Sequence, residues 1–385
     1  MLKKDITFIH SDTSEKEIYT PIAREAERRG YTTHFTEDKF AKCEIGFYCQ
    51  HDNFPSGSKL SVIMLHDIIQ GYSLWPDLWI SEAWNKYDIG ILPSTQWVEN
   101  WNRCSHRYYA NPKRGMFLAG WPKADVVDFG NLEQDRIGLY EKYGLDPARK
   151  TILYAPSWEN DGKQDDFVQA MLPLGVNILI KQYDAKPEDY PDMYRCMQEM
   201  YNLHKDIPGV TILPPSTNIF EAIKACDVLV SEESSTMCEA AMLGKPAVSV
   251  SDWLVPDVTP SRFPECNYNF VTMTLKADLG TCVRDIVENY GKYAGEVEKF
   301  REKNFENIGK SSQIIMDIID DVVEGKVTRH GALKPAARRP VPLKDLYRHL
   351  KTDFYRQYLH NWSINKPLLY KTIKAVKTAK RKIVK

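Results

Sequence analysis

Cysteine occurs only as isolated residues in this sequence. The eight cysteines form no CxxC pair, and no cluster of cysteine and histidine has the spacing of zinc ligands. Several cysteines lie inside apolar runs that are typical of a buried core. This pattern argues against a disulfide framework and a zinc site, so we expect reduced thiols and a cytoplasmic protein.

Long hydrophobic runs and an excess of one charge sign are also lacking. No apolar run reaches the roughly 20 residues that a transmembrane helix needs, and the N-terminal stretch MLKKDITFIHSD contains only a short one. We therefore expect neither a signal peptide nor a membrane-spanning helix. The formal net charge is −1, so the chain as a whole indicates neither nucleic-acid nor membrane binding.

What is present is the composition of a globular protein. Hydrophobic residues make up 43% and charged residues 27% of the 385 residues. A chain of this length exceeds what one compact core usually takes, so two domains are expected.

Short apolar runs alternate with longer amphipathic segments along most of the chain. The first part predicts a helix over 14–30, which starts at a serine and ends at a glycine. Predicted strands begin at Asp5, Tyr31, Glu44, Lys59, Asp88 and Arg114. Because these strands are continuously apolar and alternate with helices, we predict a parallel sheet covered on both faces.

The same pattern restarts after a helical segment at 131–145. Strands are predicted from Thr151, Val176, Gly209, Cys226 and Pro246, and a further helix over 310–325. We therefore predict an α/β protein with two Rossmann-like domains, 1–145 and 146–330, and a tail at 331–385. Ligands in such sheets bind beyond the carboxyl ends of the strands, and here also in the cleft between the domains.

The stretch SEESSTMCEAAMLGKP, residues 231–246, carries the clearest chemistry. Ser234 and Ser235 fall where a predicted strand turns into a helix, and Glu239 lies one turn further on the same face. Unpaired N–H groups at a helix start favour an anion, and two hydroxyls add donors for phosphate oxygens. Glu239 would accept hydrogen bonds from a ribose diol. The alternative is a plain helix cap with a surface glutamate, which the apolar neighbours of Glu239 disfavour.

Several motifs, taken in order, resemble those of the CDP-glycerol glycerophosphotransferase family. They are NIFEAIKACDVLVSEESS with the following LGKP, TILYAPSW from Thr151, AGWPKAD from Ala119, and NFENIGKSSQII from Asn304. The resemblance covers roughly residues 59–325 and is stronger in the second half of the chain.

This resemblance implies a GT-B-like fold, in which two Rossmann-like domains face a cleft and the second binds the nucleotide. It implies a transferase that moves glycerol phosphate from CDP-glycerol to a hydroxyl of a cell-surface polymer or lipid-linked acceptor and releases CMP. The hydroxyl must attack the β-phosphorus in line, which requires a base and positive charge or N–H groups on the leaving phosphate. No DxD-like cluster stands out, so we expect no metal or other cofactor.

The base is expected in the first domain. His66, in MLHDIIQG, matches a histidine of the family motif, and Asp67 would orient its imidazole. The alternative is a structural histidine at a strand end.

Five further residues are candidates for donor binding. Lys123 and Lys181 would meet the phosphates, and Ser157 and Trp158 would line the donor pocket. Thr217 lies in a loop that would hold the nucleobase. The alternatives are a surface lysine for Lys123 and a helix cap for Thr217.

The sequence also departs from the family pattern. Gln182 and Tyr183 follow Lys181 where the family has a second histidine, and Glu159 replaces an arginine. Glu232 and Glu233 stand where the family has Asp-Tyr, although extra acids near a diphosphate are unfavourable. These changes leave three alternatives open: a GT-B glycosyltransferase that uses a UDP- or CMP-sugar, a nucleotide-sugar 2-epimerase, and a scaffold without activity.

The tail at 331–385 is basic, with aromatic and apolar residues interleaved. It predicts one or two amphipathic helices, of a kind that lies on anionic membrane surfaces. We therefore expect a peripheral enzyme on the inner face of the membrane. The alternatives are a helix that packs on the protein and, less favoured because no RNA-binding signature accompanies it, a nucleic-acid partner.

Overall fold

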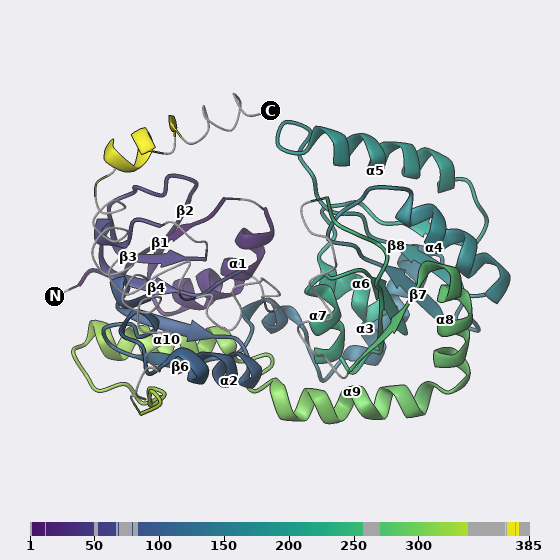
Figure 1. The fold of residues 1–385 in the computed structure, drawn as a ribbon. Helices are drawn as coiled ribbons and strands as arrows, with labels where there is room; N and C mark the ends of the chain where they lie inside the picture. Colours follow the sequence, from purple (N-terminus) through teal and green to yellow (C-terminus); the bar gives the residue numbers. More distant parts are fainter. Residues whose placement is uncertain are drawn as a thin grey trace, which may run out of the picture. The chain divides into compact units, whose positions relative to one another are not determined.

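The computed structural model describes residues 2–11, 13–49, 53–66, 68, 79, 84–256, 270–337, 366, 368–373 and 375–376. The chain forms two compact units (Figure 1). The first comprises Met1–His66, Leu74–Asp125 and Glu306–Lys385, and the second comprises Asp67–Ser73 and Val126–Phe305. Each unit is built on one parallel sheet, which confirms the predicted α/β class.

The first sheet has the strand order β2-β1-β3-β4-β5-β6. Successive side chains along each strand point to opposite faces of this sheet. Phe8 and Phe47 contact Tyr19 of helix α1, whereas their neighbours Ile9 and Tyr48 face a core that includes Trp97 of helix α2. The elements are β1 (Asp5–Ile9), α1 (Thr13–Arg28), β2 (Thr32–Thr36), β3 (Cys43–Tyr48), β4 (Ser58–Ile63), β5 (Ile89–Leu92), α2 (Thr95–Cys104), β6 (Met116–Leu118) and α10 (Ser311–Val323).

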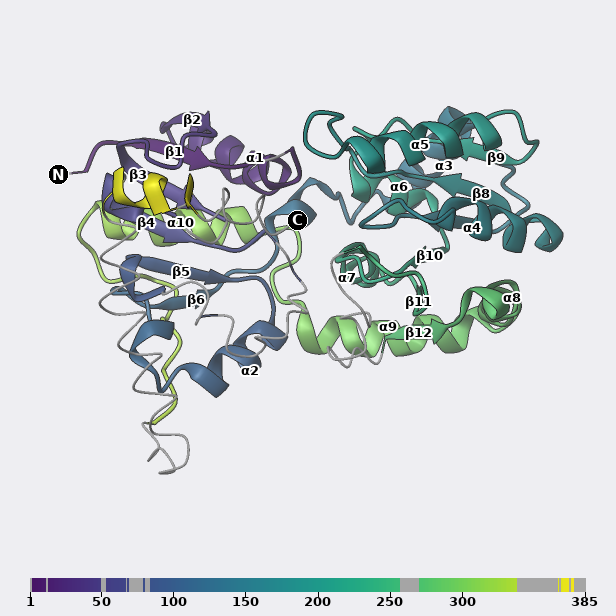
Figure 2. The ribbon, with the colours of Figure 1, turned by 45° about the horizontal axis from the view of Figure 1, so that its top comes forward.

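The second sheet has the order β12-β11-β10-β7-β8-β9. Its central strands are buried along their whole length, which explains their continuous apolar runs. Helices α4 and α8 pack on one face, and α6 and α7 lie on the other (Figures 1 and 2). The elements are α3 (Leu132–Tyr143), β7 (Thr151–Tyr154), α4 (Lys163–Met171), β8 (Asn177–Ile180), α5 (Pro191–His204), β9 (Val210–Ile212), α6 (Ile219–Ala225), β10 (Val228–Ser231), α7 (Thr236–Met242), β11 (Ala247–Val250), β12 (Val271–Thr274), α8 (Leu279–Glu288) and α9 (Tyr290–Asn304).

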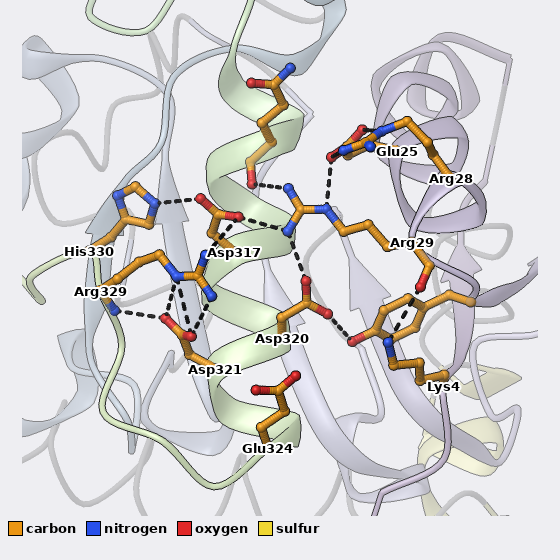
Figure 3. A network of polar contacts seen from close by, with 12 residues as sticks. Lys4, Glu25, Arg28, Arg29, Asp317, Asp320, Asp321, Glu324, Arg329 and His330 are labelled. Atoms are coloured by element: carbon orange, nitrogen blue, oxygen red, sulfur yellow. Dashed lines mark hydrogen bonds and ion pairs between the residues drawn. The ribbon is translucent and has the colours of Figure 1, made fainter.

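Helix α10 belongs to the first unit, whereas we expected residues 146–330 to form the second domain. An ionic network centred on Arg29 of α1 attaches it (Figure 3). The Arg29 guanidinium donates to Asp317 at 2.7 Å and to Asp320 at 2.8 Å, and it also pairs with Glu25 of its own helix. Charges 288 and 291 residues apart in sequence thus hold the two helices together.

Two of the family-like motifs meet at the start of α10. The carboxylate of Asp125, which ends AGWPKAD, accepts the backbone N–H groups of Ser311 at 3.0 Å and Ser312 at 2.6 Å. Gly120 has a φ of +96°, and a Cβ there would lie 2.5 Å from the Ser311 hydroxyl. The glycine and the aspartate of the motif are therefore required by the close approach and capping of this helix.

The segment after α10 stays on the first unit. Arg329 pairs with Asp321 (Figure 3). The backbone N–H of Leu333 donates to the carbonyl of Met116 in edge strand β6 at 2.7 Å. The Ala336 N–H donates to the Ser105 hydroxyl at 2.7 Å. Most of the expected amphipathic tail at 331–385 lies outside the described residues. Within those residues, no helix combines the length and apolar character needed to cross a bilayer.

Candidate active site

The second sheet has a point where the strand order reverses. The chain runs from β7 outward to β8 and β9, then returns to place β10 on the other side of β7. The loops that follow β7 and β10 therefore leave the same carboxyl edge side by side. This is the position at which open α/β sheets bind ligands.

Glu232 joins these two loops. Its carboxylate is fully buried and accepts the backbone N–H groups of Ser157 and Trp158, each at 2.9 Å, and the Ser157 hydroxyl at 2.8 Å. The Ser231 hydroxyl donates to it at 2.9 Å, and the Lys163 ammonium lies 3.7 Å away. The acid that seemed unfavourable beside a diphosphate is thus turned inward, where it fixes the loop that carries Ser157 and Trp158.

The departures at Glu159 and Gln182 form part of a buried polar layer. The Tyr154 hydroxyl donates to Glu159 at 2.7 Å, and the Gln182 amide donates to Gln164 at 2.7 Å and to the Met197 carbonyl at 2.9 Å. Burial raises the pKa of Glu159 to about 7, despite the hydrogen bond from Tyr154. Glu159 and Gln182 therefore have structural partners in the interior of the second unit, next to the loop that follows β7.

The two serines at the start of α7 differ in role. The Ser234 hydroxyl accepts the backbone N–H of Thr236 at 3.3 Å, so Ser234 does the capping. The Ser235 side chain makes no capping hydrogen bond and is partly exposed. Glu239 lies in the first turn of α7 and is 1% exposed, which agrees with its apolar flanks and not with a surface position.

Lys181 and Thr217 lie on neighbouring loops at the same edge of the sheet. The Lys181 ammonium donates to the Pro215 carbonyl at 3.1 Å and so connects the ends of β8 and β9. Asn218 accepts the Phe220 N–H at 2.9 Å and caps α6, so Thr217 does not fill that role.

Trp158 belongs to an aromatic group beside this edge. Its ring lies 5.5 Å from that of Tyr190, and Tyr190 lies 6.4 Å from Tyr183, all edge to face. Met193 and Met197 of α5 pack beneath them. Such a platform of partly exposed rings is suited to contact with a planar base.

His66 follows β4 at the carboxyl edge of the first sheet, and its side chain is 22% exposed. Its Nδ1 atom lies 3.2 Å from the Cys49 carbonyl and 4.0 Å from the carboxylate of Glu15. The role of Glu15 could not be predicted from the sequence, since an acidic residue in a first helical turn is ordinarily explained by the helix dipole alone. Asp67, expected to orient His66, lies outside the described residues.

Lys123 also belongs to the first unit. It is buried apart from a small part of its surface, and its ammonium lies 3.3 Å from the Glu17 carboxylate. It is therefore not an ordinary surface lysine. Within the described segments, no group of three or more histidine, cysteine, aspartate and glutamate side chains is arranged to hold a metal ion.

Solved structures with the same fold support this architecture. The wall teichoic acid polymerase TagF aligns at 14% identity and a TM-score of 0.59 over 84% of this chain and 89% of that one. A putative UDP-N-acetylglucosamine 2-epimerase from Listeria monocytogenes aligns at 11% identity and a TM-score of 0.60 over 87% and 100%. The expected GT-B-like fold is thereby confirmed.

Comparison with curated proteins gave no match. The model of the family described as CDP-Glycerol:Poly(glycerophosphate) glycerophosphotransferase matches residues 80–319, which is more than half of the chain. The resemblance seen in the motifs is therefore confirmed: the chain belongs to this family, whose members are transferases that move glycerol phosphate from CDP-glycerol.

Proposed function

We propose that this enzyme extends a poly(glycerol phosphate) chain of the teichoic acid type, with the donor held at the carboxyl edge of the second sheet. One observation carries the proposal: the loops after β7 and β10 lie at the reversal of strand order and are fixed together by Glu232. Ser157, Trp158 and Ser235 lie on these two loops, beyond the carboxyl ends of β7 and β10. TagF, which has this fold, is named as a teichoic acid polymerase.

Each donor contact follows from the chemistry of the residues. Ser235 would donate its hydroxyl to the diphosphate, and Glu239 would accept hydrogen bonds from the ribose. Trp158 would contact the cytosine, and Thr217 would contribute to the loop that holds this base. The Lys181 and Lys123 ammonium groups would offset the charge of the phosphates, and Ser234 would set the start of the helix beneath them.

His66 would act as the base. It would take the proton of the acceptor hydroxyl, whose oxygen then forms a bond to the β-phosphorus of CDP-glycerol. The bond from that phosphorus to the bridging oxygen breaks, and CMP leaves with the electron pair. This route draws on the protein's own groups and on no metal ion.

The basic tail would bring the enzyme to an anionic membrane surface from the cytoplasmic side. Residues 331–385 contain 15 lysines and arginines and only 2 acidic residues. In the described part of the tail Leu368 is 83% exposed, whereas Tyr370 packs against Phe40 with ring centroids 5.9 Å apart. In the helical segment 368–373, Tyr370 therefore packs on the first unit, whereas Leu368 and Lys371 are exposed to solvent.

The donor is tested by incubating the protein with CDP-glycerol, a UDP-sugar and a CMP-sugar in the presence of poly(glycerol phosphate), and measuring released nucleotide. We expect CMP from CDP-glycerol, lost in His66→Ala and unaffected by EDTA. Release only from a UDP- or CMP-sugar would favour the glycosyltransferase alternative and reject the proposal.

The membrane proposal is tested by flotation with vesicles of anionic and of neutral lipid. The truncated chain should end after Ala337, because residues up to Ala336 bind the first unit. We expect the full chain, and not the truncated one, to float with anionic vesicles. Equal flotation of both would reject the tail as the anchor.

A further inference from the structure

Glu15 is a buried carboxylate near His66 that has no role in the reaction steps above. It lies in the first turn of α1, its side chain is 0% exposed, and it accepts a hydrogen bond from the backbone N–H of Ser11. A carboxylate in such a place is costly unless positive charge or hydrogen-bond donors compensate it. Its other oxygen, Oε1, points toward the imidazole of His66, 4.0 Å from Nδ1.

Two acceptors therefore face the same nitrogen of His66. The Cys49 carbonyl lies 3.2 Å from Nδ1, within hydrogen-bond distance. The backbone N–H of His66 donates to the same carbonyl at 3.1 Å, which fixes the residue to the end of β3. A proton on Nδ1 is thus held by the carbonyl, and the lone pair is left on Nε2, where a base needs it.

The carbonyl and the carboxylate contribute differently. The carbonyl selects the tautomer, but as a neutral group it compensates little of the charge that His66 gains when it accepts a proton. An ionised Glu15 carboxylate places a negative charge 4.0 Å from Nδ1, and because its own side chain is 0% exposed, solvent screens this charge less than that of a surface carboxylate.

We propose that Glu15 is a positioning residue for His66, which balances the positive charge of the imidazolium formed as the acceptor hydroxyl is deprotonated. The inference rests on the proposed role of His66 as the base. The proton moves from the acceptor hydroxyl to Nε2, the Nδ1 proton stays with the Cys49 carbonyl, and Glu15 remains ionised throughout.

Other titratable groups lie beside this pair. Tyr19 of α1 and Cys49 after β3 are both fully buried, and Tyr19 lies near Glu15, Cys49 and Tyr87. Burial holds the pKa of Tyr19 well above its ordinary value, so this hydroxyl stays neutral and does not replace the carboxylate. Glu17, also on α1, pairs with Lys123.

The pH dependence of the full-length enzyme tests the proposal. Removing a negative charge beside an imidazole favours its neutral form, so Glu15→Gln should move the acid limb of kcat/KM down by about one pH unit. The plateau value of kcat/KM above that limb should fall by at least about threefold, because an imidazole of lower pKa takes the proton of the acceptor hydroxyl less readily. Glu15→Asp keeps the charge but draws it back from Nδ1, so it should move the limb in the same direction by less than Glu15→Gln does. Glu27→Gln, the same change at an exposed site of α1, is the control.

Histidine-selective ¹⁵N NMR supplies a readout without turnover, with the His66 signal identified by its loss in His66→Asn. The His66 titration midpoint should fall in Glu15→Gln in parallel with the acid limb. A folded Glu15→Gln enzyme with unchanged limb and midpoint overturns the proposal. If this variant does not fold, Glu15→Asp decides: any downward shift of the midpoint supports the proposal, and no shift rejects it.

The result is distinguishable from failure of the proposed function. Full CMP release by His66→Asn would reject His66 as the base and the inference with it. Loss of release in His66→Asn together with an unshifted Glu15→Gln profile would reject the role of Glu15 and leave the role of His66 standing.

Discussion

The carboxylate of Glu232 lies 2.9 Å from the backbone nitrogen of Ser157, although the two residues are 75 positions apart in the sequence. This contact joins the loop after β10 to the loop after β7 at the reversal of strand order. It also settles which way this acid of the SEESS motif faces: inward, onto backbone donors and the Lys163 ammonium.

Glu232→Ala should destabilise the second unit by about 3 kcal/mol. The change leaves two backbone N–H groups without their acceptor and removes the negative charge beside the buried Lys163 ammonium, which keeps its hydrogen bond to the Trp158 carbonyl. The KM for CDP-glycerol should rise as the loop loosens. Urea unfolding measures the first effect. Glu233→Ala, at the adjacent and partly exposed position, should cost under about 1 kcal/mol. Equal losses in the two variants would contradict the account.

Glu159 predicts a pH dependence of stability. Burial raises its folded pKa from 4.5 to about 7, so its contribution is fully present below about pH 4.5 and is lost as the pH rises through 7. The wild type should therefore lose up to about 3 kcal/mol between pH 5 and pH 8 from this group. Thermal unfolding at both values should show a smaller difference in Glu159→Gln. Glu199→Gln, on an exposed part of α5, should behave as the wild type.

Arg29→Ala should cost about 2 kcal/mol, because Glu25, Asp317 and Asp320 lose a shared cation and α10 loses its attachment to α1. Arg28 is the matched control. Its side chain is 68% exposed and pairs with Glu25 alone in the network of Figure 3. Arg28→Ala should cost less than about 0.5 kcal/mol. Denaturant unfolding of the two variants in parallel checks the difference, and similar values would refute a structural role for the network.

Two adjacent residues are predicted to have different roles: Asn218 caps α6, and Thr217 contacts the donor. Asn218→Ala should lower stability by about 1 kcal/mol, because it removes the cap of α6. Thr217→Ala should leave stability nearly unchanged and raise the KM for CDP-glycerol. A stability loss at Thr217 with an unchanged KM would show that it has a structural role and no contact with the donor.

The sequence was sufficient to predict the two parallel sheets, because their central strands are continuously apolar and each is followed by turn or cap residues. The edge strand β12 was not predicted, since VTMT is only partly buried and has no such signature. The membership of α10 in the first unit could not be predicted either. It rests on contacts between residues far apart in the sequence, such as those of Arg29 with Asp317 and Asp320 and of Asp125 with the start of α10.

The candidate site was predictable in part. The motif at Ser231–Pro246 pointed to the edge of the second sheet at which the strand order reverses, because a strand end followed by hydroxyls and small residues is a local pattern. The inward turn of Glu232 and the burial of Glu15 were not predictable, since both depend on which backbone donors and side chains the fold brings near them. The sequence alone does not distinguish a glutamate that faces solvent from one that faces a histidine.

The most direct test of the account is a crystal structure of the protein with CDP-glycerol. We predict the diphosphate within hydrogen-bond distance of the Ser235 hydroxyl and the cytosine against the ring of Trp158, at the edge that Glu232 fixes. A nucleotide bound away from the loops after β7 and β10 would contradict the central claim.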